Sequence, residues 1–250
     1  PWVARERAKQ ILDVDKVNFV LDWFRLAEAV DITALSFEEA WKESEEWHST
    51  LGADKLEIKR LKQIPLEMSK VVAEIDGYYI VVLDSAEELN REGKLMKHCV
   101  SESFLNITGY DEEKIAYSIR DKKNRPLVTF TINFLEDNFV ELEEVRGKSN
   151  TLPEIIYYRI IIKWLEQQNI TSLKLGIVLR NQDDIDFLST LSKLNISFHL
   201  KVKLGNIQTI PKEIFHLKQL VGLDLSENFL NEIPDEIFQL TQLKVLNLSY

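Results

Sequence analysis

A cysteine beside a histidine is the first feature of this chain that suggests chemistry. Cys99 is the only cysteine and follows His98, one of four histidines. A thiolate can act as a nucleophile and an imidazole as a general base. Adjacent residues point to opposite faces of a strand, or about 100° apart on a helix, so these two side chains cannot readily pair. A nucleophilic Cys99 needs a base from elsewhere, such as His48. The alternative is a small buried hydrophobic side chain.

A second candidate for chemistry is the run Arg-Gly-Lys-Ser-Asn at residues 146–150. Arg146 offers a bidentate fork, Gly147 allows close backbone approach, and a helix expected just downstream adds a favourable dipole. The run predicts an anion-binding loop. The alternative is a solvated turn in which Asn150 or Thr151 caps the helix.

Together these residues define one expected site. Its spacing matches no Walker loop, dinucleotide fingerprint or HExxH zinc motif, so we expect no metal and no cofactor. The candidate catalytic residues are His98, Cys99 and Arg120, and the candidate binding residues are Thr129, Arg146, Gly147 and Asn150.

Helices are expected in the first part of the chain, where apolar residues from Val17 to Val30 recur at helical spacing. Ser36 followed by Glu39 forms a capping box for a helix that carries Trp41. The tryptophans of this region are most simply packing residues.

From Val71 onward the apolar spacing changes to two, which is typical of strands. Strands at 71–75 and 78–83 flank Asp76-Gly77, a dipeptide that favours a tight hairpin turn. Asp84-Ser85 then caps a short helix through Leu89.

The remaining elements before the repeats follow from similar patterns. Three more strands are expected at 115–120, 127–133 and 139–145. Pro153 begins a helix through Gln168, and a strand at 170–175 and a helix at 183–194 follow. The sequence therefore predicts an α+β fold: N-terminal helices packed on a mostly antiparallel sheet of about five strands, followed by the start of a leucine-rich repeat solenoid.

The solenoid is expected from a repeat of 23 residues at the end of the chain, which superposes Ile210-Pro211 on Ile233-Pro234. Residues 220–230 fit the leucine-rich repeat pattern L-x-x-L-x-L-x-x-N-x-L and resemble the bacterial kind with an Ile-Pro turn. Its leucines point into a stacked core, and its Asn satisfies backbone groups. Gly205 stands where an earlier copy wants Asn, so 194–216 is expected to be an entry repeat. The strand face of such a solenoid predicts a protein partner.

Composition narrows the functional classes. A net charge of −10 argues against a general binder of nucleic-acid backbones, although a local basic site stays open. One cysteine excludes an internal disulfide framework and favours a reducing compartment. The sequence has no leader pattern and no apolar run of about 18 residues, so a cytoplasmic location and no membrane are expected. Because it starts at Pro1 and stops in mid-repeat, we expect a piece of a longer protein.

The stretch around His98 resembles a known family. Glu92-Gly93 and Leu-Met-Lys-His-Cys-Val at 95–100 are similar to the E-G-x-x-L-H-H-C-V signature of PcfJ-like proteins, found on bacterial conjugative plasmids and other mobile elements. The match continues through Arg120, Pro126 to Thr129 and 146–150, and covers roughly residues 15–168. The resemblance implies a domain without naming a reaction.

Some positions depart from the family pattern. Lys97 replaces the first histidine of the doublet, and Phe104 or Tyr110 is the nearest match for the tyrosine that usually follows. Thr131 stands for an acidic residue and Glu144 for a glutamine. If the family site uses those groups, the site in this chain is weakened or repurposed.

Four parts are expected: a helical region at 1–66, a PcfJ-like α+β core at 67–169, a transition at 170–193 and truncated leucine-rich repeats at 194–250. Protein recognition by the repeats is the favoured function. An alternative is an enzyme acting on a phosphate-containing or nucleic-acid substrate, with His98 as acid/base and Arg120 and Arg146 as anion clamp. A third possibility gives His98 and Cys99 only a stabilising role.

Overall fold

The computed structural model describes residues 2–7, 14–26, 31–51, 55–98, 114–205, 209–228, 230 and 232–249. Contacts group the chain into two compact units. The first unit comprises Pro1–Phe130 and Val145–Pro153, and the second comprises Thr131–Glu144 and Glu154–Tyr250. The division into four consecutive parts stays a prediction.

The first unit begins with helices. They are α1 (Trp2–Arg7), α2 (Val14–Leu26), the 3-10 helix η1 (Ile32–Ala34), α3 (Phe37–Leu51) and α4 (Lys55–Leu61). Of these, α1, α2 and α3 share a hydrophobic cluster. Trp2 and Trp23 lie in the cluster with Val17, Val20, Phe37 and Ala40. The capping box is confirmed: the Ser36 hydroxyl accepts from the Glu39 N–H at 3.3 Å, and the Glu39 carboxylate accepts from the Ser36 N–H at 2.9 Å.

The expected hairpin follows a short 3-10 helix, η2 (Met68–Lys70). It consists of β1 (Val71–Ile75) and β2 (Tyr78–Leu83), which pair antiparallel. Its turn has positive φ at both central residues, 51° at Asp76 and 82° at Gly77, as a tight primed turn requires. On its other side β2 pairs antiparallel with β3 (Lys114–Arg120).

Helix α5 (Ala86–Met96) connects β2 to the segment before β3, and it is longer than the sequence predicted. Of the predicted cap Asp84-Ser85, Ser85 is the N-cap, since its side chain accepts from the Glu88 N–H. The predicted end at Leu89 is wrong, because Leu89, Leu95 and Met96 continue one buried face. Most of the stretch that begins at Glu92 is therefore helical.

The next two strands are β4 (Pro126–Leu135) and β5 (Phe139–Arg146), which are joined by the 3-10 helix η3 (Glu136–Asn138). Each of these strands has residues in both units. A 3-10 turn, η4 (Lys148–Asn150), follows β5. The remaining elements lie in the second unit: α7 (Ile155–Leu165), β6 (Ser172–Leu179), α8 (Gln182–Leu191), β7 (Ser197–Leu204), η5 (Lys212–His216), β8 (Leu220–Asp224), η6 (Asp235–Gln239) and β9 (Val245–Asn247).

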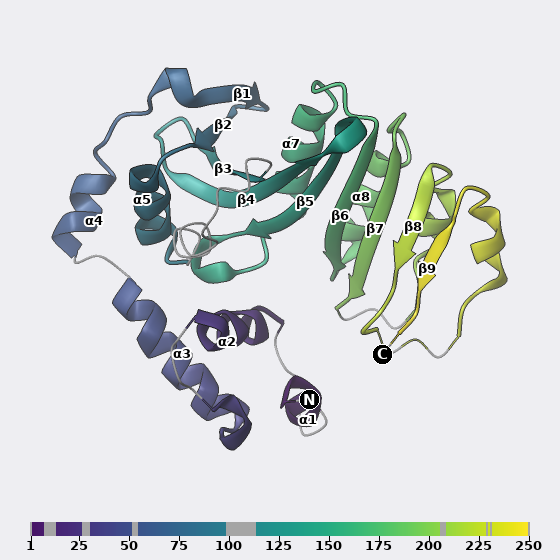
Figure 1. The fold of residues 1–250 in the computed structure, drawn as a ribbon, viewed down its shortest axis with the longest axis horizontal. Coiled ribbons are helices and arrows are strands. Elements are labelled where there is room, and N and C mark those ends of the chain that lie inside the picture. The colour runs from purple at the N-terminus through teal and green to yellow at the C-terminus, as the bar shows by residue number, and fades with distance from the viewer. Residues whose placement is uncertain are drawn as a thin grey trace. The chain divides into compact units, whose positions relative to one another are not determined.

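All strands belong to one mixed sheet in the order β1 to β9 (Figure 1). It is antiparallel in its N-terminal half, whereas β5 to β9 pair parallel. We expected a mostly antiparallel sheet of about five strands followed by the start of a solenoid. The described strands instead form a sheet of nine, so the predicted strand count is too low. The physical reason is that β5 leaves an edge open, and β6 pairs with that edge from Phe139–Ser172 onward.

The repeat part has the expected leucine-rich architecture. Leu220, Leu223 and Leu225 are buried. The Asn228 amide donates to the Val202 carbonyl at 2.7 Å and accepts from the Leu204 N–H at 2.7 Å, so it links two successive turns. Within the described residues, no helix is long and apolar enough to cross a membrane.

Candidate functional site

The end of α5 places His98 inside the first unit. Lys97 adopts a left-handed conformation (φ 54°, ψ 52°), and both its N–H and that of His98 donate to the Gly93 carbonyl. This backbone turn brings His98 to 3% exposure. A lysine in this conformation costs on the order of 1 kcal/mol or more, because its Cβ crowds the carbonyl. Lys97, which stands where the family pattern has a histidine, is thus the C-cap of α5.

His98 begins a chain of buried hydrogen bonds. Its Nε2 lies 2.8 Å from the Thr129 hydroxyl, which donates to Glu92 Oε1 at 2.9 Å. A hydroxyl has a single proton, and here the carboxylate receives it. His98 Nε2 must therefore carry the proton that it shares with Thr129, which fixes the protonation of this ring nitrogen.

Arg120 continues the chain from the other oxygen of Glu92. Its Nη2 donates to Glu92 Oε2 at 2.8 Å, its Nη1 to Asn124 at 2.9 Å and its Nε to Ser118 at 3.1 Å. The ion pair is buried, with Glu92 at 0% and Arg120 at 3% exposure. All three guanidinium nitrogens are engaged, so Arg120 ties α5 to β3 and to the turn that follows.

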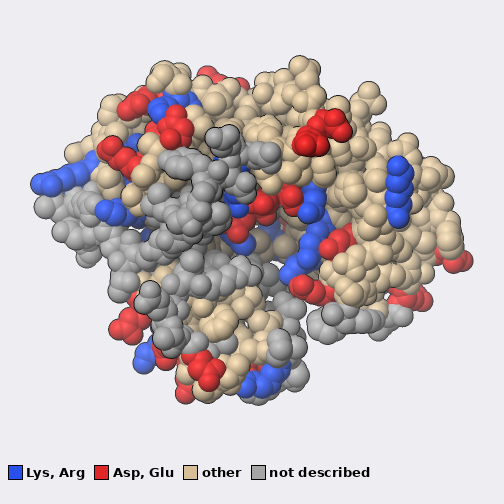
Figure 2. Space-filling model, viewed as in Figure 1, with Lys and Arg blue, Asp and Glu red and all other residues tan. Residues whose placement is uncertain are grey.

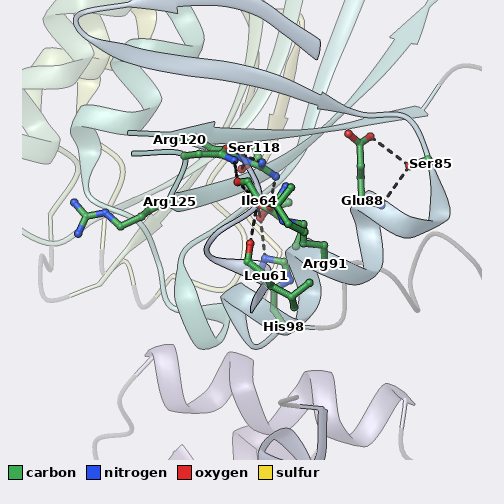
Figure 3. A network of polar contacts seen from close by, with 12 residues as sticks. Leu61, Ile64, Ser85, Glu88, Arg91, His98, Ser118, Arg120 and Arg125 are labelled. Atoms are coloured by element: carbon green, nitrogen blue, oxygen red, sulfur yellow. Dashed lines mark hydrogen bonds and ion pairs between the residues drawn. The ribbon is translucent and has the colours of Figure 1, made fainter. Parts of the chain in front are cut away.

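We call these hydrogen-bonded residues the buried network: His98, Thr129, Glu92, Arg120, Ser118 and Asn124. A second arginine, Arg91, lies beside this network. Arg91 donates to the carbonyls of Leu61 and Ile64, each at 3.2 Å (Figure 3). Burial, and then the charge of Arg120, lower the pKa of Arg91. Asn124 also donates to the Ile64 carbonyl, at 2.9 Å. The segment after α4 is thereby fastened to the network.

The predicted anion loop closes on itself. The Gly147 N–H donates to the Thr151 carbonyl at 2.8 Å, and a methyl group on Gly147 would lie 2.7 Å from the Thr151 hydroxyl oxygen. The residue at the N-cap of α7 is Glu154, so the alternative of an Asn150 or Thr151 cap is wrong. Asn150 is 2% exposed with φ 57°.

The structure joins three predicted site residues by hydrogen bonds, and it packs η4, which holds Asn150, against α5. His98, Thr129 and Arg120 share the buried network. Among the described residues, no hydrogen bond joins Arg146, Gly147 or Asn150 to it. Cys99 lies outside the described residues, as does the side chain of His48. No group of three or more His, Cys, Asp or Glu in the described part could hold a metal ion.

Sequence reasoning missed Glu92, Ser118 and Asn124 as members of the network. A signal for Glu92 was present: it shares the apolar face of α5 with Leu89 and Met96, and a carboxylate on a buried face needs a cationic partner. Ser118 lies two residues before Arg120, on the same face of β3.

A different polar surface occupies the parallel strands of the second unit. We call it the strand face: the side chains of β5 to β8 opposite the buried leucines. One row across the strands holds Glu141, Lys174, His199 and Gly222, and the next holds Gly176, Lys201 and Asp224. Its acidic side chains lie on the outer strands β5 and β8, and its lysines lie on the central strands β6 and β7. Figure 2 shows Lys and Arg side chains beside Asp and Glu side chains on the face that it draws.

Ion pairs cross the strand face. Lys174 pairs with Glu141 at 2.5 Å, Lys201 with Asp224 at 3.8 Å and Lys203 with Glu227 at 2.8 Å. These lysines are 53%, 43% and 42% exposed, in contrast to the buried network.

Comparison with family models gives two matches. Residues 34–157 match the model of the PcfJ-like proteins, and residues 199–250 match a leucine-rich repeat model. The chain carries a PcfJ-like domain and a leucine-rich repeat segment. No curated protein and no solved structure matched the chain. The buried network lies within the match to the PcfJ-like model, and the repeat match covers β8, β9 and all but the first two residues of β7.

Proposed function

We propose that this chain is a protein-recognition module in which a PcfJ-like domain carries a leucine-rich repeat binding surface. The observation that supports it is the strand face. Along β6, buried Leu173, Leu175 and Ile177 alternate with exposed Lys174 and Gly176. Helix α8 packs against β6, and its Phe187, Leu188 and Leu191 are buried. The strand face is therefore the polar side of the parallel strands.

A bulky side chain on the strand face tests this function. Gly176→Trp places an indole where a methyl group would meet a single atom of the described residues, Cβ of Lys201 at 4.0 Å. The matched control is Ser189→Trp, at an exposed position on α8. Both variants are used as baits of the full chain in affinity capture from bacterial extracts, with mass spectrometry to identify the proteins retained.

The expected result is that identified partners of the unchanged chain are lost with Gly176→Trp and kept with Ser189→Trp. If Gly176→Trp retains every partner while remaining folded by circular dichroism, recognition through the strand face is wrong.

A second candidate function is an enzyme that acts on a phosphate-containing or nucleic-acid substrate. It is favoured by the convergence of His98, Thr129 and Arg120 in one hydrogen-bonded network. In that function His98 is the acid/base and Arg120 and Arg146 hold the anion. The burial of His98 and the three partners of Arg120 weigh against it, because a substrate would have to displace them.

Hydrolysis of labelled single-stranded nucleic acids and of a chromogenic phosphodiester tests the second candidate. His98→Gln should remove any turnover, whereas His216→Gln, at an exposed position, should not. Turnover that survives in His98→Gln assigns the reaction to other residues.

A further inference from the structure

The strand face contains an open corner at Gly176. Its neighbours are Lys174, two residues earlier on the same side of β6, and Lys201, its Cα partner on β7. Gly176 is exposed, and among the described residues only Cβ of Lys201 comes within 4.0 Å of a methyl group placed on it. Two ammonium-bearing side chains thus border a position with no side chain of its own.

The His199 ring, which neighbours this corner on β7, lies against Gly222 of β8. A methyl group on Gly222 would be 2.2 Å from His199 Nδ1, so the imidazole covers that glycine of β8. Only a glycine at this β8 position allows such an approach. The His199 ring also lies near the ring of Phe139 on β5, with 6.0 Å between the ring centroids.

Both lysines retain capacity for another acceptor. Each ammonium has three N–H groups. One carboxylate pairs with each, Glu141 with Lys174 and Asp224 with Lys201, the latter at the long distance of 3.8 Å. A further carboxylate over Gly176 would receive hydrogen bonds from both sides.

The flanking acids restrict what can bind. From β5 to β8 the charge order is acidic (Glu141, Glu143), basic (Lys174), basic (Lys201, Lys203) and acidic (Asp224). A polyanion would meet repulsion on both flanks, and a polycation would meet it at the centre. A fitting partner carries one acidic group with basic groups on either side.

We propose that the Gly176 corner is a seat for an acidic side chain of a protein partner, presented by an extended segment of the form basic-x-acidic-x-basic. This rests on the proposed recognition function and names the chemistry of its partner. We call the Gly176 corner with Lys174 and Lys201 the carboxylate seat.

The spacing supports an extended segment that crosses the strands. From a point midway between β6 and β7, the strands β5 and β8 are one and a half strand spacings away, about 7 Å. Residues two apart in an extended chain are about 6.7 Å apart and point to the same side. An acidic residue over the seat therefore brings basic residues at both second neighbours over Glu141 and Asp224.

The test is a titration of the full chain with blocked peptides, followed by the amide NMR signals of Gly176, Lys174 and Lys201. The probe is Lys-Ala-Glu-Ala-Lys, and the comparisons are the charge-inverted Glu-Ala-Lys-Ala-Glu and inorganic phosphate. The probe should shift the three signals at millimolar concentration, and the two comparisons should not.

Variants sharpen the result. Lys201→Gln should weaken binding of the probe peptide roughly two- to five-fold, which corresponds to the loss of one exposed ion pair. Lys203→Gln, two residues further along β7, is the matched control and should change the affinity less than two-fold. Gly176→Val fills the corner with a residue suited to strands and should abolish the shifts.

The outcomes separate this inference from the function on which it rests. Absence of shifts at Gly176, or equal shifts with phosphate or the inverted peptide, overturns the carboxylate seat. Recognition by the strand face still stands in that case if Gly176→Trp loses its partners. A probe that binds as expected while Gly176→Trp keeps all partners supports the seat and overturns the proposed function.

Discussion

The buried network and the strand face are built from the same kinds of residue and differ in burial. Glu92 and Arg120 are at most 3% exposed, whereas Lys174 and Glu141 are 53% and 22% exposed. A buried charge has no water to stabilise it, so removing one member of a buried ion pair leaves the charge of the other member uncompensated. A charge in water exchanges partners at little cost. The network is therefore suited to hold the PcfJ-like domain together, and the strand face to exchange its ion pairs for those of a partner.

Removing the carboxylate of the network should have the largest effect. Glu92→Gln leaves Arg120 buried without its counter-charge and should lower the free energy of unfolding by about 3–5 kcal/mol. The matched change on the strand face, Glu141→Gln, should cost less than about 1 kcal/mol. Urea unfolding followed by circular dichroism measures both. Equal losses would break the distinction between the two regions.

The hydroxyl that joins His98 to Glu92 should have the next effect. Thr129→Val leaves the His98 Nε2–H and one Glu92 oxygen without their partner, at a cost of about 1–3 kcal/mol. Thr129→Ser keeps the hydroxyl and should stay close to the unchanged chain. If serine is as damaging as valine, the methyl group of Thr129 matters and the hydrogen bonds do not.

Two glycines of the strand face should respond differently to a methyl group. Gly222→Ala meets His199 Nδ1 at 2.2 Å and must displace the ring, whereas Gly176→Ala enters open space. We expect Gly222→Ala to cost roughly 1 kcal/mol or more, the lower end of overpacking, and Gly176→Ala to be neutral or slightly stabilising. Thermal unfolding of the two variants compares them directly. A destabilised Gly176→Ala would mean that the corner is filled.

The smallest expected effect concerns the titration of His199. Burial, and then the charge of Lys174, lower the pKa of His199 below its usual 6.5. The charged groups on the same face of the strands, in its row or the next, are Glu141 on β5, Lys174 on β6, Lys201 on β7 and Asp224 on β8. Because the unfolded chain binds this proton more readily, His199 contributes stability that is present above pH 6.5 and lost as the pH falls through the folded pKa.

NMR titration of His199 checks this direction. Lys174→Gln should raise the pKa part of the way toward 6.5, since burial, the larger cause, remains. Gly222→Ala should raise it as well by moving the ring into water. A pKa at or above the usual value in the unchanged chain would contradict the burial of this side chain.

Local patterns accounted for many elements of the fold. Asp76-Gly77 with period-two strands predicted the first hairpin, Ser36 and Ser85 predicted helix starts, and the repeat predicted the buried leucines and the role of Asn228. The interactions behind these signals join residues that are close in the chain or lie in one repeat, so they can be predicted from the sequence. The end of α5 was misjudged because its apolar face continues past Leu89 and its C-cap is Lys97, not the usual glycine.

The candidate site was only partly predictable. The family resemblance pointed to His98, Arg120 and Thr129, which the structure joins in one network. The resemblance did not indicate that Ser118 and Asn124 accept hydrogen bonds from two of the three guanidinium nitrogens of Arg120. Those bonds depend on the conformation of β3 and of the turn that follows it. The resemblance also did not indicate the hydrogen-bond acceptor of the Gly147 N–H, because that acceptor is the Thr151 carbonyl within the same loop.

The sequence by itself determined most strands of the core, the starts of several helices and the leucine-rich turns. Only the tertiary structure decided that Glu92 pairs with Arg120, that the repeat strands extend the sheet of the PcfJ-like domain, and that Gly176 lies between two lysines. The physical reason is range: hydrogen bonds and apolar periodicity act between near neighbours in the chain, whereas burial and strand register bring distant residues together.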